Sequence, residues 1–332
     1  MILVTGGSGF IGANFIIKWL QENDSPIVNL DKLTYAANQK NLEFVHDSEN
    51  YFFEKGSIDD YSLVSSLFKK YQPLAVINFA AESHVDRSIA DSNEFISTNI
   101  IGTHVLLKAS FDFFDKLDQS KKDNFKYIQI STDEVYGSLL DLDPQSSEDS
   151  TYYPNSPYSA SKASGDHLVR AWHETYGLPT LTTNCTNNYG PFQHQEKLIP
   201  LIIHNCLENK QLPIYGDGLN IRDWLFVEDH CDALRVILEK GVVGETYNIG
   251  GKNEIKNIEV VKKVCDLMDE LRPKKDGNSY HKLINFVNDR LGHDYRYGLN
   301  ISKIEQELNW SPKENFDSGL KKTVEWYLNI SK

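Results

Sequence analysis

Two side chains with complementary acid–base chemistry, Tyr158 and Lys162, stand four residues apart in the sequence. Ser156 and Pro157 predict that a helix begins just before them, so the phenol and the ammonium group share one helix face. A nearby ammonium group lowers the pKa of a phenol from its ordinary value of about 10, and the phenolate could remove a hydroxyl proton. The spacing alone is more often explained by ordinary packing and solvent exposure on a helix, so it needs support from other residues.

A second group of reactive side chains, Thr132, Asp133 and Glu134, follows a predicted strand at 127–131. In open α/β sheets, ligands bind beyond the carboxyl ends of the strands. Thr132 could orient a hydroxyl group there. Two adjacent carboxyl groups suggest further proton transfer, with one acid protonated and the other ionised. A solvated acidic loop is the other interpretation of the two acids alone.

Three glycines, Gly6, Gly9 and Gly12, follow the apolar segment 2–5 and open a predicted helix at 9–20. Glycines at this spacing allow a tight turn, a close approach of the backbone to a pyrophosphate, and close packing of helix against strand. The free N–H groups at the start of a helix also favour phosphate oxygens. The segment therefore predicts a dinucleotide-binding site.

An acidic residue, Asp31, lies 19 residues after Gly12, just beyond a predicted strand at 26–30. A carboxylate at this point would bind the hydroxyl groups of the adenine ribose and repel a 2′-phosphate, so the pattern favours NAD over NADP. Ala80 and Ala81 follow another predicted strand. Their small side chains would let the cofactor pass close to the backbone.

Strands and helices alternate along the first half of the chain. This order predicts an α/β fold, a Rossmann-type doubly wound parallel sheet, with a smaller, mixed α/β C-terminal region that binds substrate. We expect an NAD-binding domain over 1–186, to which 224–250 returns, and a substrate-binding domain over 187–223 and 251–332. After about residue 187, clusters of Gly, Pro and Asn predict short helices with irregular connections. The predicted strands span 2–5, 26–30, 51–54, 74–79, 127–131 and 179–184, and the predicted helices span 9–20, 59–71, 91–117 and 157–176.

Composition narrows the functional classes. The 332 residues include 34 Lys and Arg against 47 Asp and Glu, a net charge of −13. This balance argues against a basic face for nucleic acid or a membrane surface. No segment has the length of an apolar membrane span, and the N-terminus lacks the features of a signal peptide. The four cysteines are spread singly, so we expect free thiols, no metal site and a cytoplasmic protein.

Eight segments share their order and spacing with one known family. They are 6–12 (GGSGFIG), 78–88 (NFAAESHVDRS), 131–137 (STDEVYG), 158–162 (YSASK), 187–191 (NNYGP), 196–200 (EKLIP), 215–230 (YGDGLNIRDWLFVEDH) and 289–297 (DRLGHDYRY). The chain therefore resembles the extended short-chain dehydrogenase/reductase superfamily, and within its nucleotide-sugar-modifying branch the dTDP-glucose 4,6-dehydratase family. The resemblance runs through essentially the whole chain.

The resemblance implies dehydration of dTDP-glucose to dTDP-4-keto-6-deoxyglucose, a step of deoxysugar biosynthesis, with a tightly bound NAD that is regenerated in each cycle. It implies that Tyr158 accepts the proton of the 4-hydroxyl and that Lys162 tunes Tyr158 and holds the nicotinamide ribose. Thr132 would bind the oxygen at carbon 4. Glu134 would remove the proton from carbon 5, and Asp133 would protonate the hydroxyl that leaves carbon 6. The implied NAD contacts are Gly6, Gly9, Phe10, Ile11, Gly12, Asp31, Lys32, Ser57, Ile58, Ala80, Ala81, Asn99, Tyr158 and Lys162.

The resemblance also implies a substrate site in the C-terminal region. Arg222 and Arg290 would hold the diphosphate, because a guanidinium group binds phosphate oxygens in a bidentate fork. Pro213 and Tyr215 would flank the nucleotide base. The remaining implied substrate contacts are Ser83, Asp86, Arg87, Asn187, Glu196, Lys197, Leu198, Asn220, Asn253, His293 and Tyr297.

Three positions depart from the family pattern. Ser57 stands where an Asp is usual, Asn184 where an Arg is usual, and Leu291 where a Pro is usual. We expect these changes to alter affinity rather than the reaction. The alternatives are a GDP-mannose or CDP-glucose 4,6-dehydratase, a UDP-sugar 4-epimerase or decarboxylase, and a catalytically silent NAD-binding regulatory protein. The family further implies a homodimer formed through the helices near 92–117 and 157–176.

Overall fold

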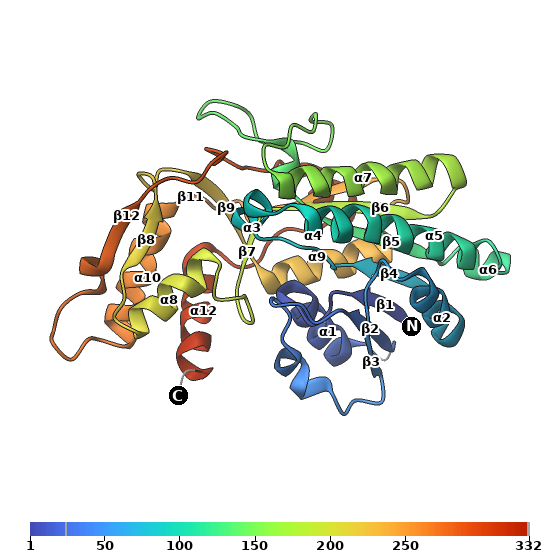
Figure 1. Cartoon of the computed structure of the whole chain (residues 1–332), viewed down its shortest axis with the longest axis horizontal. Helices are drawn as coiled ribbons and strands as arrows, with labels where there is room; N and C mark the ends of the chain where they lie inside the picture. Colours follow the sequence, from blue (N-terminus) through green and yellow to red (C-terminus); the bar gives the residue numbers. More distant parts are fainter. Residues whose placement is uncertain (24, 331–332) are drawn as a thin grey trace.

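A parallel sheet of seven strands organises the larger part of the molecule in the computed structural model, which describes residues 1–23 and 25–330 (Figure 1). The strand order is β3-β2-β1-β4-β5-β6-β10, and every neighbouring pair is parallel. The order reverses between β1 and β4, which makes a topological switch point. The predicted doubly wound fold is confirmed. The strands are β1 (Ile2–Thr5), β2 (Ile27–Asp31), β3 (Tyr51–Lys55), β4 (Ala75–Asn78), β5 (Lys126–Thr132), β6 (Thr180–Cys185) and β10 (Thr246–Ile249).

Helices cover both faces of this sheet, because alternate strand residues are apolar on both sides. Ile2 and Val4 of β1 belong to one core, and Leu3 belongs to the core on the opposite face. Figure 1 shows α5 and α7 together on one face and α1 with α9 on the other. The first face carries α2 (Tyr61–Tyr71), α5 (Thr103–Phe114) and α7 (Pro157–Tyr176), and the second carries α1 (Phe10–Glu22), α9 (Val227–Lys240) and α11 (Ser302–Leu308).

Helix α7 begins and ends where the sequence predicts. Ser156 and Ser159 form a capping box, and Pro157 occupies the first turn. Gly177 ends the helix with a left-handed backbone, at φ +68°. These local signals fix the start of the helix, which carries Tyr158 and Lys162 on its first two turns.

The long helix predicted over 91–117 is present as one continuous helical run over 93–114, but it is not α-helical throughout. After the separate helix α3 (Val85–Ala90), the run consists of α4 (Asn93–Phe95), a π-helical segment (Ile96–Gly102) and α5. The wider turn accompanies the hydrogen bonds of Asn99, which accepts from the Glu82 backbone and donates to Ser161. A π-helical turn inside a helix is often found at functional sites.

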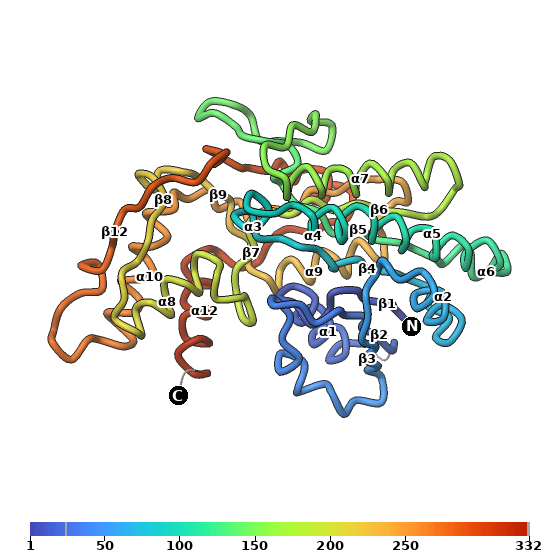
Figure 2. Tube along the Cα trace, viewed as in Figure 1, coloured from blue at the N-terminus to red at the C-terminus, as the bar shows by residue number. Residues whose placement is uncertain are grey.

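The rest of the chain forms a second packed region around its own core (Figure 2). The prediction of short helices and irregular connections is wrong for most of it, because apolar residues recur at helical spacing along α10, α8 and α12. Two small sheets, β11-β9-β7 and β12-β8, complete this region. Its elements are β7 (Asn187–Tyr189), α8 (Leu198–Leu207), β8 (Leu212–Tyr215), β9 (Ile221–Phe226), β11 (Glu254–Lys256), α10 (Asn257–Leu271), β12 (Ile284–Val287) and α12 (Phe316–Ile330).

The chain crosses between the two regions several times. β9 pairs with β7 and β11, whereas α9 contacts α1 and β10 pairs with β6. The division into 1–186 with 224–250, and 187–223 with 251–332, stays a prediction. Within residues 1–23 and 25–330, no helix has both the length and the apolar character needed to cross a membrane. All four cysteines are buried free thiols.

Candidate active site

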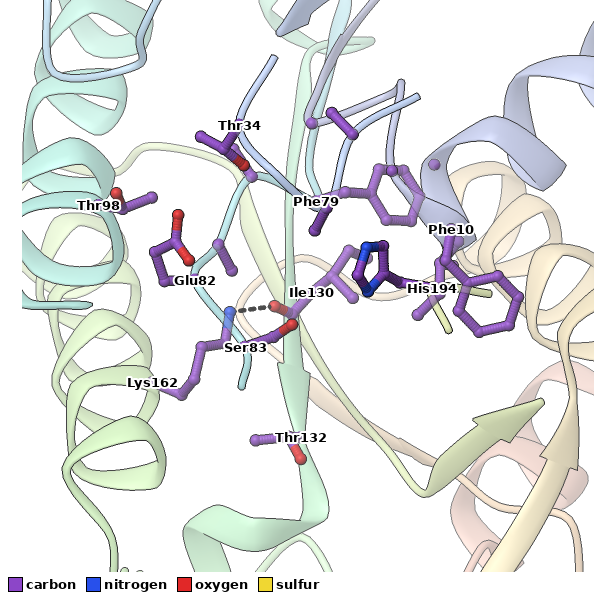
Figure 3. A pocket seen from close by; sticks show the side chains of 18 of the residues that line it. Phe10, Thr34, Phe79, Glu82, Ser83, Thr98, Ile130, Thr132, Lys162 and His194 are labelled. Carbon is purple, nitrogen blue, oxygen red and sulfur yellow. Dashed lines mark hydrogen bonds between the residues drawn. The ribbon is translucent and has the colours of Figure 1, made fainter. Parts of the chain in front are cut away.

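A cavity of about 300 Å³ runs along the carboxyl ends of the central strands, at the switch point between β1 and β4 (Figure 3). Its walls come from the segments that follow β1, β2, β4, β5 and β6, together with the first turns of α7 and the loop before α8. The cavity thus gathers residues that are far apart in the sequence. This is where the doubly wound fold favours a ligand.

The glycine-rich segment packs too tightly for any other residue type at two positions. Gly6 has φ +68°, and a Cβ atom there would lie 2.6 Å from the backbone nitrogen of Ala80. A Cβ atom on Gly12 would lie 2.6 Å from the carbonyl oxygen of Gly6. The first N–H groups of α1 have no partner within the helix, so this cradle suits a pyrophosphate.

Asp31 closes the adenosine end of the cavity. Its carboxylate accepts hydrogen bonds from the backbone N–H groups of Ser8 at 2.9 Å and Leu33 at 2.7 Å. Burial raises the pKa of Asp31, and these two hydrogen bonds oppose that rise. Each oxygen keeps a lone pair for a ribose hydroxyl, so the donor set fits a dinucleotide without a 2′-phosphate.

Thirteen of the fourteen predicted NAD contacts line the cavity, and Asn99 does not. Its amide instead bonds to the backbone of Glu82 and to the Ser161 hydroxyl, so it holds the segment after Ala81 in place. The thirteen are Gly6, Gly9, Phe10, Ile11, Gly12, Asp31, Lys32, Ser57, Ile58, Ala80, Ala81, Tyr158 and Lys162.

Tyr158 and Lys162 enter the cavity from one face of α7. The ammonium group of Lys162 donates to the carbonyl oxygen of Ile130 at 2.6 Å (Figure 3). Burial and the nearby charge of Glu134 hold the pKa of Tyr158 well above its ordinary value, while the Thr132 side chain opposes that rise. The phenol is therefore neutral in this state. Because Lys162 is engaged with β5, further positive charge is needed to produce the phenolate.

The chain turns sharply after β5 and presents Thr132, Asp133 and Glu134 together. Thr132 Oγ1 donates to Asp133 at 3.2 Å and accepts from the Glu134 backbone N–H at 3.3 Å. Burial and the charge of Glu134 raise the pKa of Asp133 well above its ordinary value. Burial also raises the pKa of Glu134, but Lys197, Arg290 and Arg222 oppose that rise. The surroundings thus raise the pKa of Asp133 more strongly than that of Glu134, which has three cations acting on it.

Four of the predicted substrate contacts line the cavity: Ser83, Asn187, Glu196 and Lys197. The ammonium group of Lys197 donates to the Ser83 carbonyl at 2.9 Å, which joins the segment after β4 to the one before α8.

A second set of predicted substrate contacts lies near the cavity without lining it. Tyr215 donates to Asp86 at 3.4 Å, and Arg290 lies 3.9 Å from the same carboxylate. Arg87 lies 3.6 Å from Glu196. The remaining members are Leu198, Pro213, Asn220, Arg222, Asn253, His293 and Tyr297, which the structure places on or beside α8, β8, β9 and the 289–297 segment.

Several of these outer side chains are engaged within the protein. Arg222 donates to the carbonyl groups of Ile221, Asp294 and Tyr295, and its guanidinium group lies 4.3 Å from the centre of the Tyr297 ring. Three other members are also bonded within the protein: the Asn220 amide donates to the carbonyl of Asp294, the Asn253 amide donates to the carbonyls of Gly251 and Trp224, and the His293 ring bonds the carboxylate of Asp289. In this conformation Arg222 acts on the site mainly through its charge, which favours the ionised forms of Asp133 and Glu134.

Sequence reasoning missed one side of the cavity. Thr34, Ala36 and Ala37 line it from the loop after β2, and Gln193 and His194 line it from the loop before α8. Their position next to strand ends and marker segments was the available signal. The other unpredicted lining residues are Leu30, Gly56, Phe79, Glu82, Thr98, Ile130, Ser131, Cys185, Thr186 and Asn188.

The three departures from the family pattern lie in different surroundings. Ser57 lines the cavity. Asn184 is buried and donates to the hydroxyl groups of Tyr136 and Tyr152. Leu291 is 77% exposed in the segment after Arg290. Ser57 alone therefore lies where it could change contact with a ligand in the cavity.

Comparison with known proteins gives consistent matches over the full length. A family model described as GDP-mannose 4,6 dehydratase matches residues 3–323. The dTDP-glucose 4,6-dehydratase of Haemophilus influenzae is 54% identical over 98% of this chain and 97% of its own. The dTDP-glucose 4,6-dehydratase of Streptomyces venezuelae, solved with NAD bound, has a TM-score of 0.90 at 41% identity, over 99% of this chain and 97% of its own. That of Bacillus anthracis, also solved with NAD, has a TM-score of 0.85 at 46% identity, over 99% and 96%.

Proposed function

The chain belongs to the dTDP-glucose 4,6-dehydratase family, and from this membership we infer that it converts dTDP-glucose to dTDP-4-keto-6-deoxyglucose. It is an NAD-dependent hydro-lyase. One structural observation supports the proposal independently of family membership. The acid pair Asp133 and Glu134 shares a single cavity with Tyr158, Lys162 and the glycine-rich segment.

The residues that would hold NAD fit it in shape and charge. Gly6 and Gly12 would leave room for the pyrophosphate, Asp31 would bind the hydroxyl groups of the adenosine ribose, and Lys162 would bind the nicotinamide ribose. When bound, NAD would supply the acceptor for a hydride from carbon 4 and, in its reduced form, the donor of a hydride to carbon 6, so the overall reaction involves no net oxidation.

The chain's own side chains move the protons. Tyr158 accepts the proton of the 4-hydroxyl, and Thr132 holds the oxygen at carbon 4. The carbonyl group formed at carbon 4 makes the neighbouring hydrogen at carbon 5 acidic, and Glu134 removes it as a proton. Carbon 5 is reprotonated when carbon 6 receives its hydride. Asp133, whose pKa burial raises well above its ordinary value, protonates the hydroxyl that leaves carbon 6 as water. Elimination thus uses two carboxyl groups whose surroundings push their pKa values apart.

Positive charge near the acid pair supports binding of the sugar diphosphate. Arg222, Arg290 and Lys197 all act on Glu134, so they surround the same space. Guanidinium groups are suited to phosphate oxygens. Tyr215, which is partly exposed on β8, would stack on the base. The resulting site fits a nucleotide diphosphate with its sugar directed at Glu134.

The same proposal extends to assembly and compartment. Ile96 and Ile101 are exposed on the helical segment that contacts α7, and such apolar side chains support a homodimer formed through these helices. Four buried free thiols support a reducing, cytoplasmic environment.

The test is mass spectrometry of the product formed from dTDP-glucose by the purified protein. We expect the loss of one water molecule, and the product should be a 4-keto sugar. GDP-mannose, CDP-glucose and UDP-galactose serve as parallel substrates. Conversion of UDP-galactose to UDP-glucose without loss of water from any sugar would overturn the proposal in favour of an epimerase.

A further inference from the structure

A buried carboxylate, Asp166, stands one turn beyond Lys162 on α7 and outside the cavity lining. The spacing of Tyr158, Lys162 and Asp166 places all three along one helix face. Asp166 and Lys162 are each only 4% exposed. Charges buried to this degree are costly unless they are paired, and the mechanism above gives Asp166 no part.

Hydrogen bonds tie Asp166 to the strand that also holds Lys162. Its Oδ2 atom accepts from the Ser131 hydroxyl at 2.5 Å and from the Tyr152 hydroxyl at 3.3 Å. Ser131 directly follows Ile130, whose carbonyl oxygen accepts from Lys162 at 2.6 Å. The Oδ1 atom of Asp166 has no hydrogen-bond partner among the described residues. Asp166 and Lys162 are therefore held by adjacent residues of β5.

Among the groups that act on the Lys162 ammonium group, Asp166 is the one that can carry a negative charge near pH 7. Asp166 on α7 and Cys185 on β6 both favour the charged form of Lys162, whereas burial lowers the pKa of Lys162. Burial raises the pKa of the Cys185 thiol to about 12, so this thiol is neutral near pH 7. Tyr158, on the same helix face, is also neutral.

The groups around Asp166 permit it to carry a charge. Burial raises its pKa to about 7, while Lys162, Ser131 and Tyr152 favour its ionised form. The phenols of Tyr127 on β5, Tyr136 after β5 and Tyr152 before α7 face it, and burial raises the pKa of each. Above about pH 7 the carboxylate is thus ionised, and its charge acts on the Lys162 ammonium group.

We propose that Asp166 is a positioning residue that keeps Lys162 protonated and held against β5, and so supports Tyr158 from outside the cavity. The inference rests on the proposed function, because it gives Lys162 its task. The carboxylate lies outside the cavity lining, so it would touch neither substrate nor cofactor. Its removal should therefore change turnover and its pH dependence rather than substrate affinity.

The test is the pH profile of dehydration by NAD-loaded Asp166→Asn. The amide keeps the shape and can keep the bonds to Ser131 and Tyr152, but it removes the charge. We expect the alkaline limb of the kcat–pH profile to move about one pH unit lower, because Lys162 then loses its proton at a lower pH. At a given pH on that limb, kcat should be about tenfold lower than in the unchanged enzyme. KM should stay within about twofold. If the Asn variant does not fold, Asp166→Ala replaces it with the same expected shift.

Asp229→Asn is the matched control, because Asp229 is a buried acid on α9 that accepts from the backbone of Lys313 and Glu314. The alkaline limb of the pH profile of Asp229→Asn should match that of the unchanged enzyme. An unshifted limb in a folded Asp166 variant, or an equal shift in the control, would overturn the inference. Absence of dehydration in the unchanged enzyme would instead count against the proposed function.

Discussion

Replacing Glu134 with Gln tests the assignment of the base that acts at carbon 5. The amide has almost the same shape, and the bond from the Glu134 backbone to Thr132 is unaffected. Loss of a positioned general base typically costs about 10²–10⁴-fold in rate, or about 3–5 kcal/mol in the barrier. The charge of Glu134 also raises the pKa of Asp133. Loss of that charge therefore lowers the pKa of Asp133, so a smaller fraction of Asp133 holds the proton that the leaving hydroxyl needs. We expect kcat to fall by about 10²–10⁴-fold.

The assay compares dTDP-glucose with the same substrate deuterated at carbon 5. The charge of Glu134 raises the pKa of Tyr158 as well, so the variant should not hinder removal of the 4-hydroxyl proton. Breaking the bond at carbon 5 then becomes the slow step, and the isotope effect on kcat should increase. Glu148→Gln is the control, because Glu148 is a part-buried acid that bonds the Asn248 backbone away from the cavity. A Glu134 variant within about tenfold of normal turnover would refute the assignment.

Three further predictions concern cofactor binding, stability and pH. Gly6→Ala should weaken NAD binding at least about tenfold in a titration, because the left-handed backbone and the 2.6 Å approach to Ala80 exclude a Cβ atom. Unchanged affinity would contradict the assignment of the glycine-rich segment as the pyrophosphate site. Leu106→Ala, at a fully buried position of α5, should lower the free energy of unfolding by about 2–5 kcal/mol in a urea titration, with NAD still bound. Burial lowers the pKa of His230 to about 3, so this histidine is neutral when folded but protonates below about pH 6.5 when unfolded. Stability should therefore fall as pH drops below 6.5, by about 2 kcal/mol at pH 5, and His230→Gln should flatten that slope.

Local signals in the sequence account for the parts of the fold that were predicted well. The glycines before α1 and the cap of α7 act through residues within one turn, so their effect can be read without the rest of the chain. Asn99 behaves differently. Its π-helical turn depends on Glu82 and Ser161, which lie 17 and 62 residues away, and no local pattern indicates them.

For the candidate site too, local sequence patterns predict some residues and not their distant contacts. Motifs placed the acid pair, Tyr158 and Lys162, because each follows a strand end or a helix start. The surroundings of Arg222 could not be predicted, because its guanidinium group is held by the carbonyl groups of Asp294 and Tyr295, about 70 residues later. Which donors are free for a ligand is decided by such distant backbone contacts.

The pairing of β10 with β6 has a consequence for how the chain folds during synthesis. Thr246 aligns with Thr182, so the last strand of the central sheet emerges more than 60 residues after its neighbour. Until β10 has been synthesised, one edge of β6 has unpaired N–H and C=O groups, which can pair with strands of other chains. A fragment that stops near residue 186 should consequently aggregate, and folding of the nascent chain should wait for the segment after α9.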